Sequence, residues 1–531
     1  MKSVILSLIV ISIVSCVSVK TQNQYLIKEH SVSDLNKDVD NVHRQLVKHH
    51  PKIYQYISKT NLDHKFDSLK QTVIKPINSQ EFFEKIAPVI ASIRQGHILV
   101  SPPFKRFSKA ARKERVKQKF EFNNLDFEEF HNKVFVTHVI DEKDSLLVGA
   151  EVVMIENELA YDLVHKFKNY FASDGYNKTL QKRFVKNRFR SFYYVNRGVI
   201  DSLNVTFKQK DSTFLRTFKR VPKAKFETDI TRIEKITNAK KITKAERKDN
   251  KLKQKEKLKL YDKYGYVKSR NEFTRNFKYI GKDSSVAYMK IRGFTTGDYK
   301  KFYKESFTKI DSLKTKNLII DLRDNSGGRL SEIDDLYSYL TKQDYIMINP
   351  CEVNSRVPFL KMFMSNTSSV GTKVFIGAFS PFLLVHNLIK VKKENGKLFY
   401  KFKQSKVKEP NTLGYKGNIY VLINGNSFSA SSIISTKLKA TGRAMFVGEE
   451  TGGAYNGTVA GLFKNYQLPT SKINVRIGLM QLEAPHKITP DGYGIIPDIK
   501  ISPTLEDRLS GNDPELNWIL NDISTKEPIK K

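Results

Sequence analysis

The sequence has few cysteines and few acidic residues for its length. Of 531 residues only two are cysteine, Cys16 and Cys351, and 55 are acidic against 92 Lys and Arg. If Cys16 is consumed at the N-terminus, Cys351 has no partner for an internal disulfide, so we expect stability to come from the hydrophobic core. Two cysteines so far apart also exclude a cysteine-rich metal site. After the first sixteen residues, no segment is expected to reach the apolar length of a transmembrane helix.

The first sixteen residues, MKSVILSLIVISIVSC, have the pattern of an export signal. Lys2 supplies a positive charge, an apolar run follows, and the small residue Ser15 precedes Cys16. The last four residues resemble a bacterial lipobox, in which the cysteine becomes the lipidated first residue of the mature chain. We therefore expect a lipoprotein of the bacterial envelope, anchored to the membrane through Cys16 and facing the periplasm. A plain cleaved signal with an incidental cysteine is the alternative.

The excess of basic residues gives a formal charge of +37 at pH 7. Such a charge raises nucleic acid or anionic membrane as a partner. No zinc knuckle, basic zipper or aromatic-glycine signature accompanies it, so we expect no nucleic-acid partner. The charge is densest in residues 216–280, which are rich in Lys and poor in apolar residues. We interpret this stretch as a solvated helix or flexible insert, with an anion-binding arm as the alternative.

The order of apolar patterns divides the remaining chain. Helical spacing in residues 17–127 predicts a small helical region, and alternating apolar residues in 128–215 predict short strands and a helix, resembling a PDZ module. After the basic insert at 216–280, strands and helices alternate through 281–531, which indicates an α/β core with helices covering a sheet.

Three ordered motifs in the second half of the chain carry the strongest chemical signal. They are DLRDNSGG at 321–328, IYVLINGNSFSASS at 419–432 and GRAMFVGEETGG at 442–453. The first is a buried-type strand ending in paired glycines, where bare backbone can approach a substrate. The second places a serine hydroxyl at a helix N-terminus, where free backbone N–H groups can stabilise an oxyanion. Taken alone, that serine-rich segment is better interpreted as an ordinary helix cap.

Together and in this order, the motifs resemble those of the S41 serine peptidases, the group of the C-terminal processing peptidases and the tricorn core. The resemblance implies an α/β, ClpP/crotonase-like protease core and a serine endopeptidase activity without metal or organic cofactor. It assigns Ser429 as nucleophile and leaves Ser427, Ser431 and Ser432 as bystanders. Ser432 stands where the family usually has Glu, a departure on the helix face.

The same resemblance implies an oxyanion hole. Its donors would be the backbone N–H of Ala430 and an N–H from the paired glycines, Gly327 or Gly328. Losing one such donor typically raises the reaction barrier by about 3 kcal/mol.

The base that activates the serine differs between the two branches of this family. The processing peptidases place a lysine in T-x-G-K, but Ala454 stands at that position here. The tricorn-like branch uses a histidine, which Gln95-Gly96-His97-Ile98 resembles, although Gly96 replaces the serine of that branch. His97 is therefore the expected base. An ordinary histidine at a helix end is the alternative.

An acid should orient that histidine. The segment PDGYGIIPD at 490–498 resembles the late E-G-x-G-x-x-P-D element of the family and suggests Asp491. Asp498 is expected to shape the turn, and Glu483 remains open as an alternative.

These observations lead to one functional expectation and one rival. We expect an enzyme that cleaves peptides or protein tails in the bacterial envelope by acyl transfer between Ser429 and His97. The rival is a catalytically inactive, peptide-binding lipoprotein on the same scaffold, suggested by the missing lysine. Oligomeric state and cleavage specificity are left open.

Overall fold

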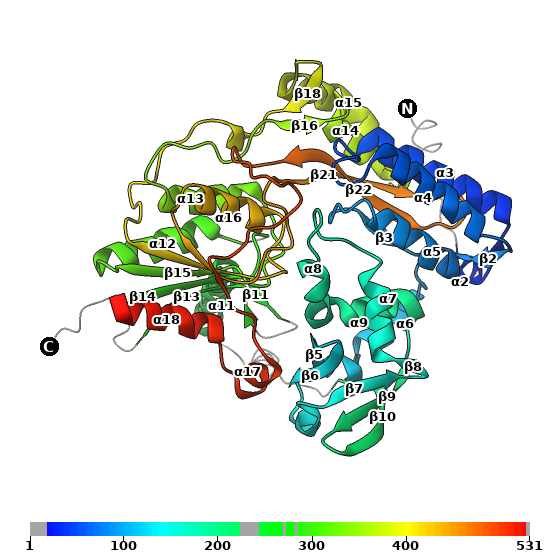
Figure 1. Cartoon of the computed structure of the whole chain (residues 1–531), viewed down its shortest axis with the longest axis horizontal. Coiled ribbons are helices and arrows are strands. Elements are labelled where there is room, and N and C mark those ends of the chain that lie inside the picture. The colour runs from blue at the N-terminus through cyan, green and yellow to red at the C-terminus, as the bar shows by residue number, and fades with distance from the viewer. Residues whose placement is uncertain (1–17, 224–243, 269–271, 282–284, 296, 527–531) are drawn as a thin grey trace.

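The computed structural model describes residues 18–223, 244–268, 272–281, 285–295 and 297–526. The expected signal and lipobox with Cys16 lie outside the described residues, as do residues 224–243 and 269–271 of the expected basic insert. Figure 1 shows the N-terminal helices in blue, a strand-rich part in cyan, and a layered sheet-and-helix part that runs from green to red.

The N-terminal region is helical, as its spacing predicts. It comprises α2 (Val19–Leu26), α3 (Val32–His49), α4 (Lys59–Thr72) and α5 (Ser79–Ala91), with a short pair of strands, β1 (Glu29–His30) and β2 (Ile77–Asn78). Leu35, Val39, Val42 and Leu46 are fully buried along one face of α3. The loop that follows α5 leads through His97 into β3 (Leu99–Ser101).

A seven-stranded antiparallel sheet forms the next part of the chain. Its strands run in the order β4-β10-β9-β7-β6-β5, with β8 beside β7, and α7 and α9 pack against them. The bounds are α6 (Lys109–Val116), β4 (Gln118–Phe120), η1 (Glu121–Asn124), β5 (Leu125–Phe130), β6 (Lys133–Val139), η2 (Glu142–Leu147), β7 (Glu151–Ile155), β8 (Glu158–Leu159), α7 (Ala160–Lys168), α8 (Thr179–Lys182), α9 (Phe184–Arg197), β9 (Ser202–Gln209) and β10 (Ser212–Pro222). The expected strands and helix are present, and the likeness to a PDZ module remains a prediction.

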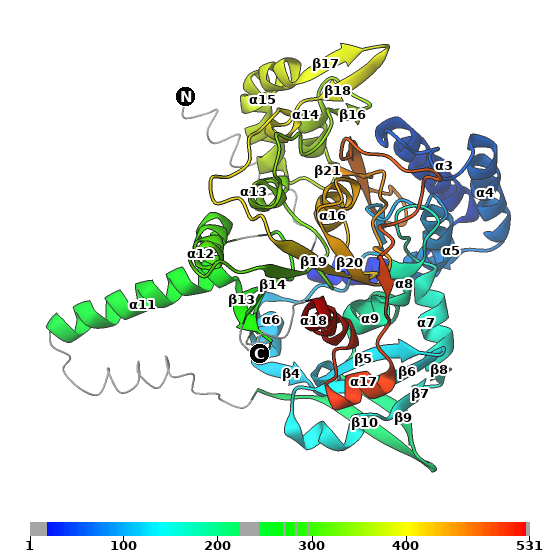
Figure 2. The same cartoon turned by 60° about the vertical axis from the view of Figure 1, so that its left-hand side comes forward.

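The basic insert predicted at 216–280 is shorter in the structure, because residues up to 222 belong to β10 and residues 275–280 form a strand of the core sheet; between them lies a helix in solvent. Helix α11 (Lys244–Tyr264) is exposed along most of its length and projects from the body in Figure 2. It leads through β11 (Tyr266–Val267) and β12 (Glu272–Phe273) into the core sheet.

The core is a six-stranded sheet between helical layers. Its order is β13-β14-β15-β19-β20-β23, parallel except for β13. The strands are β13 (Arg275–Ile280), β14 (Val286–Ile291), β15 (Asn317–Asp321), β19 (Asn418–Ile423), β20 (Met445–Gly448) and β23 (Ile499–Lys500). Helices α12 (Tyr299–Ser312), α13 (Leu330–Leu340) and α16 (Ala430–Ala440) bury one face, and α18 (Pro514–Lys526) covers the other. This confirms the α/β fold expected from the alternating pattern.

A second sheet joins the N-terminal region to the core. Its strands are β17 (Val391–Glu394), β18 (Lys397–Tyr400), β16 (Cys351–Val353), β22 (Asn474–Leu482) and β21 (Thr458–Gln467), and β3 pairs with β22. Leu99 lies opposite Arg476 in that pairing. Because β22 comes near the end of the chain, the sheet brings the loop carrying His97 against the core.

Between β16 and β17 the structure departs from the sequence-based expectation. Helices α14 (Pro358–Phe363) and α15 (Val370–Lys390) stand here, and within the described ranges α15 alone is long and apolar enough to cross a membrane. The expectation that no later segment reaches this length is therefore wrong. Polar residues are sparse in α15, but glycine, proline and serine interrupt its apolar run. The length of this run was therefore not recognised from the sequence.

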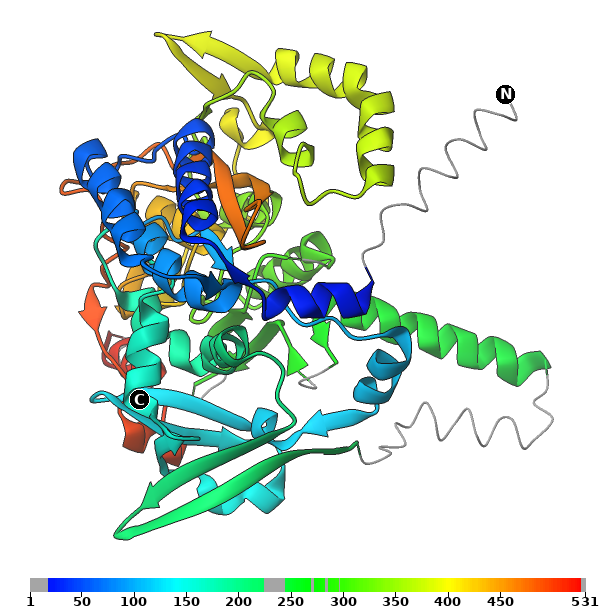
Figure 3. The ribbon, with the colours of Figure 1, turned by 90° about the vertical axis from the view of Figure 1, so that its right-hand side faces the viewer.

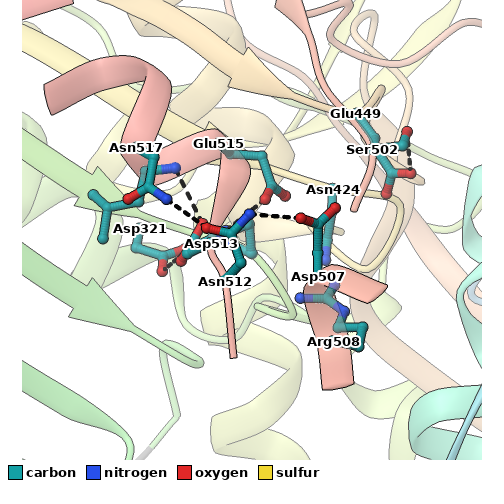
Figure 4. Close-up of polar contacts among 12 residues, drawn as sticks. Asp321, Asn424, Glu449, Ser502, Asp507, Arg508, Asn512, Asp513, Glu515 and Asn517 are labelled. Carbon is teal, nitrogen blue, oxygen red and sulfur yellow. Dashed lines mark hydrogen bonds and ion pairs between the residues drawn. The ribbon is translucent and has the colours of Figure 1, made fainter. Parts of the chain in front are cut away.

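The C-terminal helices are held to the core by a buried arginine. The Arg323 guanidinium donates to both carboxylate oxygens of Asp321 and of Asp513, and lies 3.3 Å from Glu515. Figure 4 shows the three acids gathered between α17 (Leu505–Ser510) and α18. Asp321 is 1% exposed, so its charge depends on this partner.

We expect Arg323→Met to lower the free energy of unfolding by about 3 kcal/mol, because it leaves the buried Asp321 carboxylate without a counter-charge. Urea unfolding followed by circular dichroism measures this. Arg329→Met is the matched control, since Arg329 is half exposed and pairs only with Glu332 one turn away. Equal midpoints for the two variants would contradict the expectation.

Candidate active site

Ser429 occupies a strained turn between a strand and a helix. The buried strand β19 ends at Ile423, and α16 begins at Ala430. Ser429, the residue before the helix, has φ 59° and ψ −122°, a conformation that residues with a side chain rarely adopt. Strain of this kind persists only where the surrounding structure enforces it, and it clusters at functional sites.

His97 meets Ser429 although 332 positions separate them in the sequence. Its Nε2 lies 3.0 Å from Ser429 Oγ, and its ring stacks on Phe428 at a centroid distance of 4.7 Å. The close approach requires glycine at position 96, because a Cβ there would lie 2.6 Å from the Phe428 ring. The structure thus places the two sequence-predicted residues within proton-transfer distance.

The other imidazole nitrogen contacts a residue that the sequence did not single out. Thr458 Oγ1, at the start of β21, lies 2.9 Å from His97 Nδ1. Behind it is Asp174, whose Oδ1 accepts the N–H of Gly96 at 2.8 Å. If Nδ1–H donates to Thr458, the threonine hydroxyl is free to donate to Asp174, and Nε2 is then left as an acceptor for Ser429.

The acids proposed from the late motif lie elsewhere. Asp491 accepts a hydrogen bond from Gln55 at 3.0 Å and from the N–H of Gly492, and it lines a separate cavity. Glu483 pairs with Lys487 and borders that same cavity. Neither contacts His97. Thr458 and Asp174 were missed because a lone threonine and an Asp-Gly turn carry no signal without the β21–β22 pairing.

Asp498 has the structural role expected of it. Its carboxylate accepts the N–H of Phe446 at 2.8 Å and also binds Lys439. It therefore holds the turn before β23 against β20.

The paired glycines divide into two roles. Gly327 donates its N–H to Asn325 Oδ1 at 2.9 Å, so this group is already satisfied. In the described chain the N–H groups of Gly328 and Ala430 have no acceptor, and both residues border the cavity that holds Ser429. Gly327 instead allows its turn to pack against Ser429. A Cβ at position 327, where φ is 96°, would lie 2.6 Å from Ser429 Cβ. Of the three predicted donors, Gly328 and Ala430 are the free ones.

The neighbouring serines are buried, and two of them have hydrogen-bond partners. Ser427 Oγ donates to the Leu322 carbonyl at 2.7 Å, Ser432 Oγ contacts the Ser427 carbonyl, and Ser431 is buried in α16. None of them borders the cavity that Ser429 lines.

Lys437 belongs to a different set of contacts. Its Nζ lies 3.3 Å from His486 and over the ring of Tyr337. No contact joins it to Ser429 in the part of the chain that the structure describes. Ala454, in the position of the family's lysine, forms a backbone bridge with Gly494.

A cavity of about 490 Å³ opens over Ser429 and His97. Its wall is largely apolar, with Leu330, Ile433 and Leu482. Polar side chains also line it, among them Arg329, Gln404 and Arg476 of β22. The Arg476 guanidinium lies 3.7 Å from the centre of the Phe463 ring. No acidic partner for Arg476 exists among the described residues, and its buried Nε lacks any hydrogen-bond acceptor.

Burial controls the protonation of the site. Desolvation, aided by the positive charges of Arg476 and Arg188, lowers the pKa of His97 to about 3. The imidazole is therefore neutral at pH 7, as a proton acceptor must be. Burial raises the pKa of Asp174 to about 7, against the opposing effect of hydrogen bonds from Thr458 and the backbone N–H groups of Gly96 and Ala454.

A serine on a helix tip, hydrogen-bonded to a neutral imidazole beside two free N–H groups, is the arrangement of a serine hydrolase. The comparisons agree with this class. The family model of peptidase family S41 matches residues 285–501, so the resemblance to S41 peptidases is confirmed. No curated protein sequence matches the chain.

Solved structures of CPAF share the fold. Mature CPAF is 15% identical with a TM-score of 0.58, over 93% of this chain and 97% of that one. Mature CPAF complexed with lactacystin has the same identity and a TM-score of 0.59, over 93% and 98%. The photosystem II D1 C-terminal processing protease is 12% identical with a TM-score of 0.40, over 90% and 96%. The likeness to CPAF covers the N-terminal region as well as the core.

We expect the stability of the wild type to fall relative to Asp174→Asn as pH rises from 5 to 8. A carboxyl whose pKa is raised from 3.8 to about 7 on folding stabilises the native state only while it is protonated, and this contribution is lost as pH rises through 7. Over this interval the difference should amount to about 2–3 kcal/mol.

Urea unfolding at both pH values measures the difference. Asp211→Asn, at the exposed turn between β9 and β10, is the control and should follow the wild type. Parallel pH profiles for the wild type and Asp174→Asn would show that Asp174 is not held in its neutral form.

Proposed function

We propose that the chain is a serine endopeptidase in which Ser429 attacks the peptide carbonyl and His97 serves as its base. The observation that carries the proposal is the 3.0 Å hydrogen bond between His97 Nε2 and Ser429 Oγ, in a cavity with two free backbone N–H groups. The match of residues 285–501 to the model of peptidase family S41 supports the same reaction.

Acylation begins with the serine proton. As Ser429 Oγ forms a bond to the carbonyl carbon, its proton passes to His97 Nε2 and the carbonyl π electrons move to oxygen. The N–H groups of Gly328 and Ala430 stabilise the resulting oxyanion. The C–N bond then breaks, the amine leaves with the proton from Nε2, and an acyl-enzyme remains.

Deacylation repeats these steps with water. His97 takes a proton from water as the oxygen attacks the ester, and returns it to Ser429 when the C–O bond breaks. Thr458 is a positioning residue, because it accepts the Nδ1–H and so keeps Nε2 free. Asp174 accepts the N–H of Gly96 and a hydrogen bond from Thr458, and so supports both from behind.

The expected location supplies the substrate class. A chain lipidated at Cys16 and facing the periplasm would meet unstructured peptides and protein tails of the envelope. An extended peptide could add to a sheet edge of the β4–β10 part. The inactive, peptide-binding alternative is not favoured, because the base expected in place of the missing lysine has a geometry suited to proton transfer.

Replacing the two reacting groups tests the proposal. We expect Ser429→Ala and His97→Ala each to lower cleavage of an unfolded fluorogenic protein at least 1,000-fold, since each removes a reacting group. Labelling with a fluorophosphonate should vanish in Ser429→Ala. Lys437→Ala is the control and should keep its activity.

Two results would overturn the assignment. A folded wild type that neither cleaves nor labels would favour the inactive scaffold. Loss of activity in Lys437→Ala with retention in His97→Ala would make the lysine the base.

We further propose that Arg476 binds a carboxylate of the substrate. It is a guanidinium without an acidic partner among the described residues, in the same cavity as Ser429. Leaving it without an anion costs desolvation, which a substrate carboxylate would recover through charge-assisted hydrogen bonds. The carboxylate could be that of an Asp or Glu side chain near the scissile bond, or that of a C-terminus.

We expect Arg476→Gln to lower kcat/KM about 10- to 100-fold for peptides with a carboxylate in reach, and to leave neutral peptides unchanged. Peptides with Glu against Gln, and with a free against an amidated C-terminus, identify the source. The variant should also shift the acid limb of kcat/KM to higher pH, because the arginine charge lowers the pKa of His97. Equal losses for charged and neutral peptides, without this shift, would contradict the proposal.

A further inference from the structure

Helix α15 presents an apolar surface that the described chain does not cover. Eight of its large apolar side chains are 43–73% exposed, among them Phe375, Phe379, Phe382, Val385 and Ile389. Of the most apolar 18-residue stretch of this helix, within Gly371–Lys390, only 6% is buried. A helix that is apolar on all sides is normally buried in a protein core or in lipid. An apolar helix exposed to water, such as α15, therefore indicates a binding surface.

Both ends of this helix are fixed to the same body. Before it, the side chain of Asn366 exchanges two hydrogen bonds with the backbone of Gln467 in β21. Near its end, Asn387 Oδ1 accepts the N–H of Phe359, and His386 contacts Tyr400 of β18 at 3.2 Å. A helix tied at both ends to one side of a globular body can lie in a bilayer surface but cannot cross the bilayer.

The charges around α15 suit an anionic surface. Residues 356–406 contain ten Lys and Arg and one acidic residue, Glu394. Lys392, Lys393 and Lys397 are exposed on the β17–β18 hairpin directly after the helix. Basic residues beside an apolar helix are typical of segments that bind anionic lipid.

The position of α15 fits the expected anchor. Figure 3 shows α15 (yellow-green), α2 (dark blue) and the lysine-rich α11 (green) extending toward the same side of the molecule. Helix α2 begins three residues after Cys16, so a lipid at that cysteine would enter the membrane from this side.

We propose that α15 is a membrane-docking helix that inserts its phenylalanines into the surface of an anionic bilayer. The body is thereby held against the membrane at a second point besides the N-terminus. A second copy of the chain is a poorer partner, because pairing two α15 helices would bring their lysine sets together in a protein of formal charge +37. The inference is independent of catalysis and of lipidation.

A tryptophan at the most exposed apolar position of α15 tests the proposal. Trp518 is the only tryptophan of the chain. In full-length Trp518→Phe protein, Phe382→Trp reports on α15, and Leu146→Trp on the exposed end of η2 is the matched control. Each is mixed with vesicles of phosphatidylglycerol and phosphatidylcholine whose acyl chains are brominated or unbrominated.

We expect brominated chains to quench the reporter at position 382 at least twofold and the control at 146 by less than a fifth. Lys392→Gln with Lys393→Gln should weaken the quenching, as should vesicles of phosphatidylcholine alone. Phe375→Trp replaces the reporter if Phe382→Trp shows an altered circular dichroism spectrum.

Equal quenching at 382 and 146 would overturn the proposal. So would a concentration-dependent blue shift at 382 that needs no vesicles, because that result would assign the surface to a second copy.

Discussion

The pairing of β3 with β22 is the contact on which the site depends. It is only three residues long, yet it fixes the loop that carries His97 against the sheet that carries Arg476. The same sheet holds Thr458 at the start of β21, opposite Leu482 of β22. The histidine, the group that orients it and the arginine beside it are thus aligned by the hydrogen-bond ladder of one sheet, while Ser429 comes from the other.

Burial determines how these groups behave. His97 is deprived of water and faces two arginines, so its proton affinity is low and it is present as the free base. Asp174, which is buried one layer deeper, has the opposite shift, because desolvation disfavours its charge. At pH 7 the imidazole is uncharged and the carboxyl, whose pKa is about 7, is only partly ionised, which limits the electrostatic cost of burying these two groups.

Local patterns sufficed to predict the α/β core, and the resemblance to S41 peptidases singled out Ser429 and His97, which lie 3.0 Å apart in the structure. The strands around Ile319 and Val421 are short buried runs, and paired glycines and a serine-rich helix start mark the turns between them. Thr458 and Asp174 join the site through contacts between segments far apart in the sequence, so no local pattern could indicate them. Asp491 was proposed because the late motif resembles an element of the family, but in the structure this residue lines a separate cavity and contacts Gln55 instead of His97. Helix α15 escaped notice because its glycines, proline and serines divide the apolar run.

The segment that matches the peptidase family lacks the imidazole, which lies almost two hundred residues upstream. Since β22 must be in place before β3 can pair with it, the Ser429–His97 hydrogen bond cannot form on an incomplete chain. A nascent or truncated molecule would carry Ser429 without its imidazole, and by the proposed mechanism it would not cleave the proteins around it. The topology therefore delays the assembly of the reacting groups until nearly all of the polypeptide has been made.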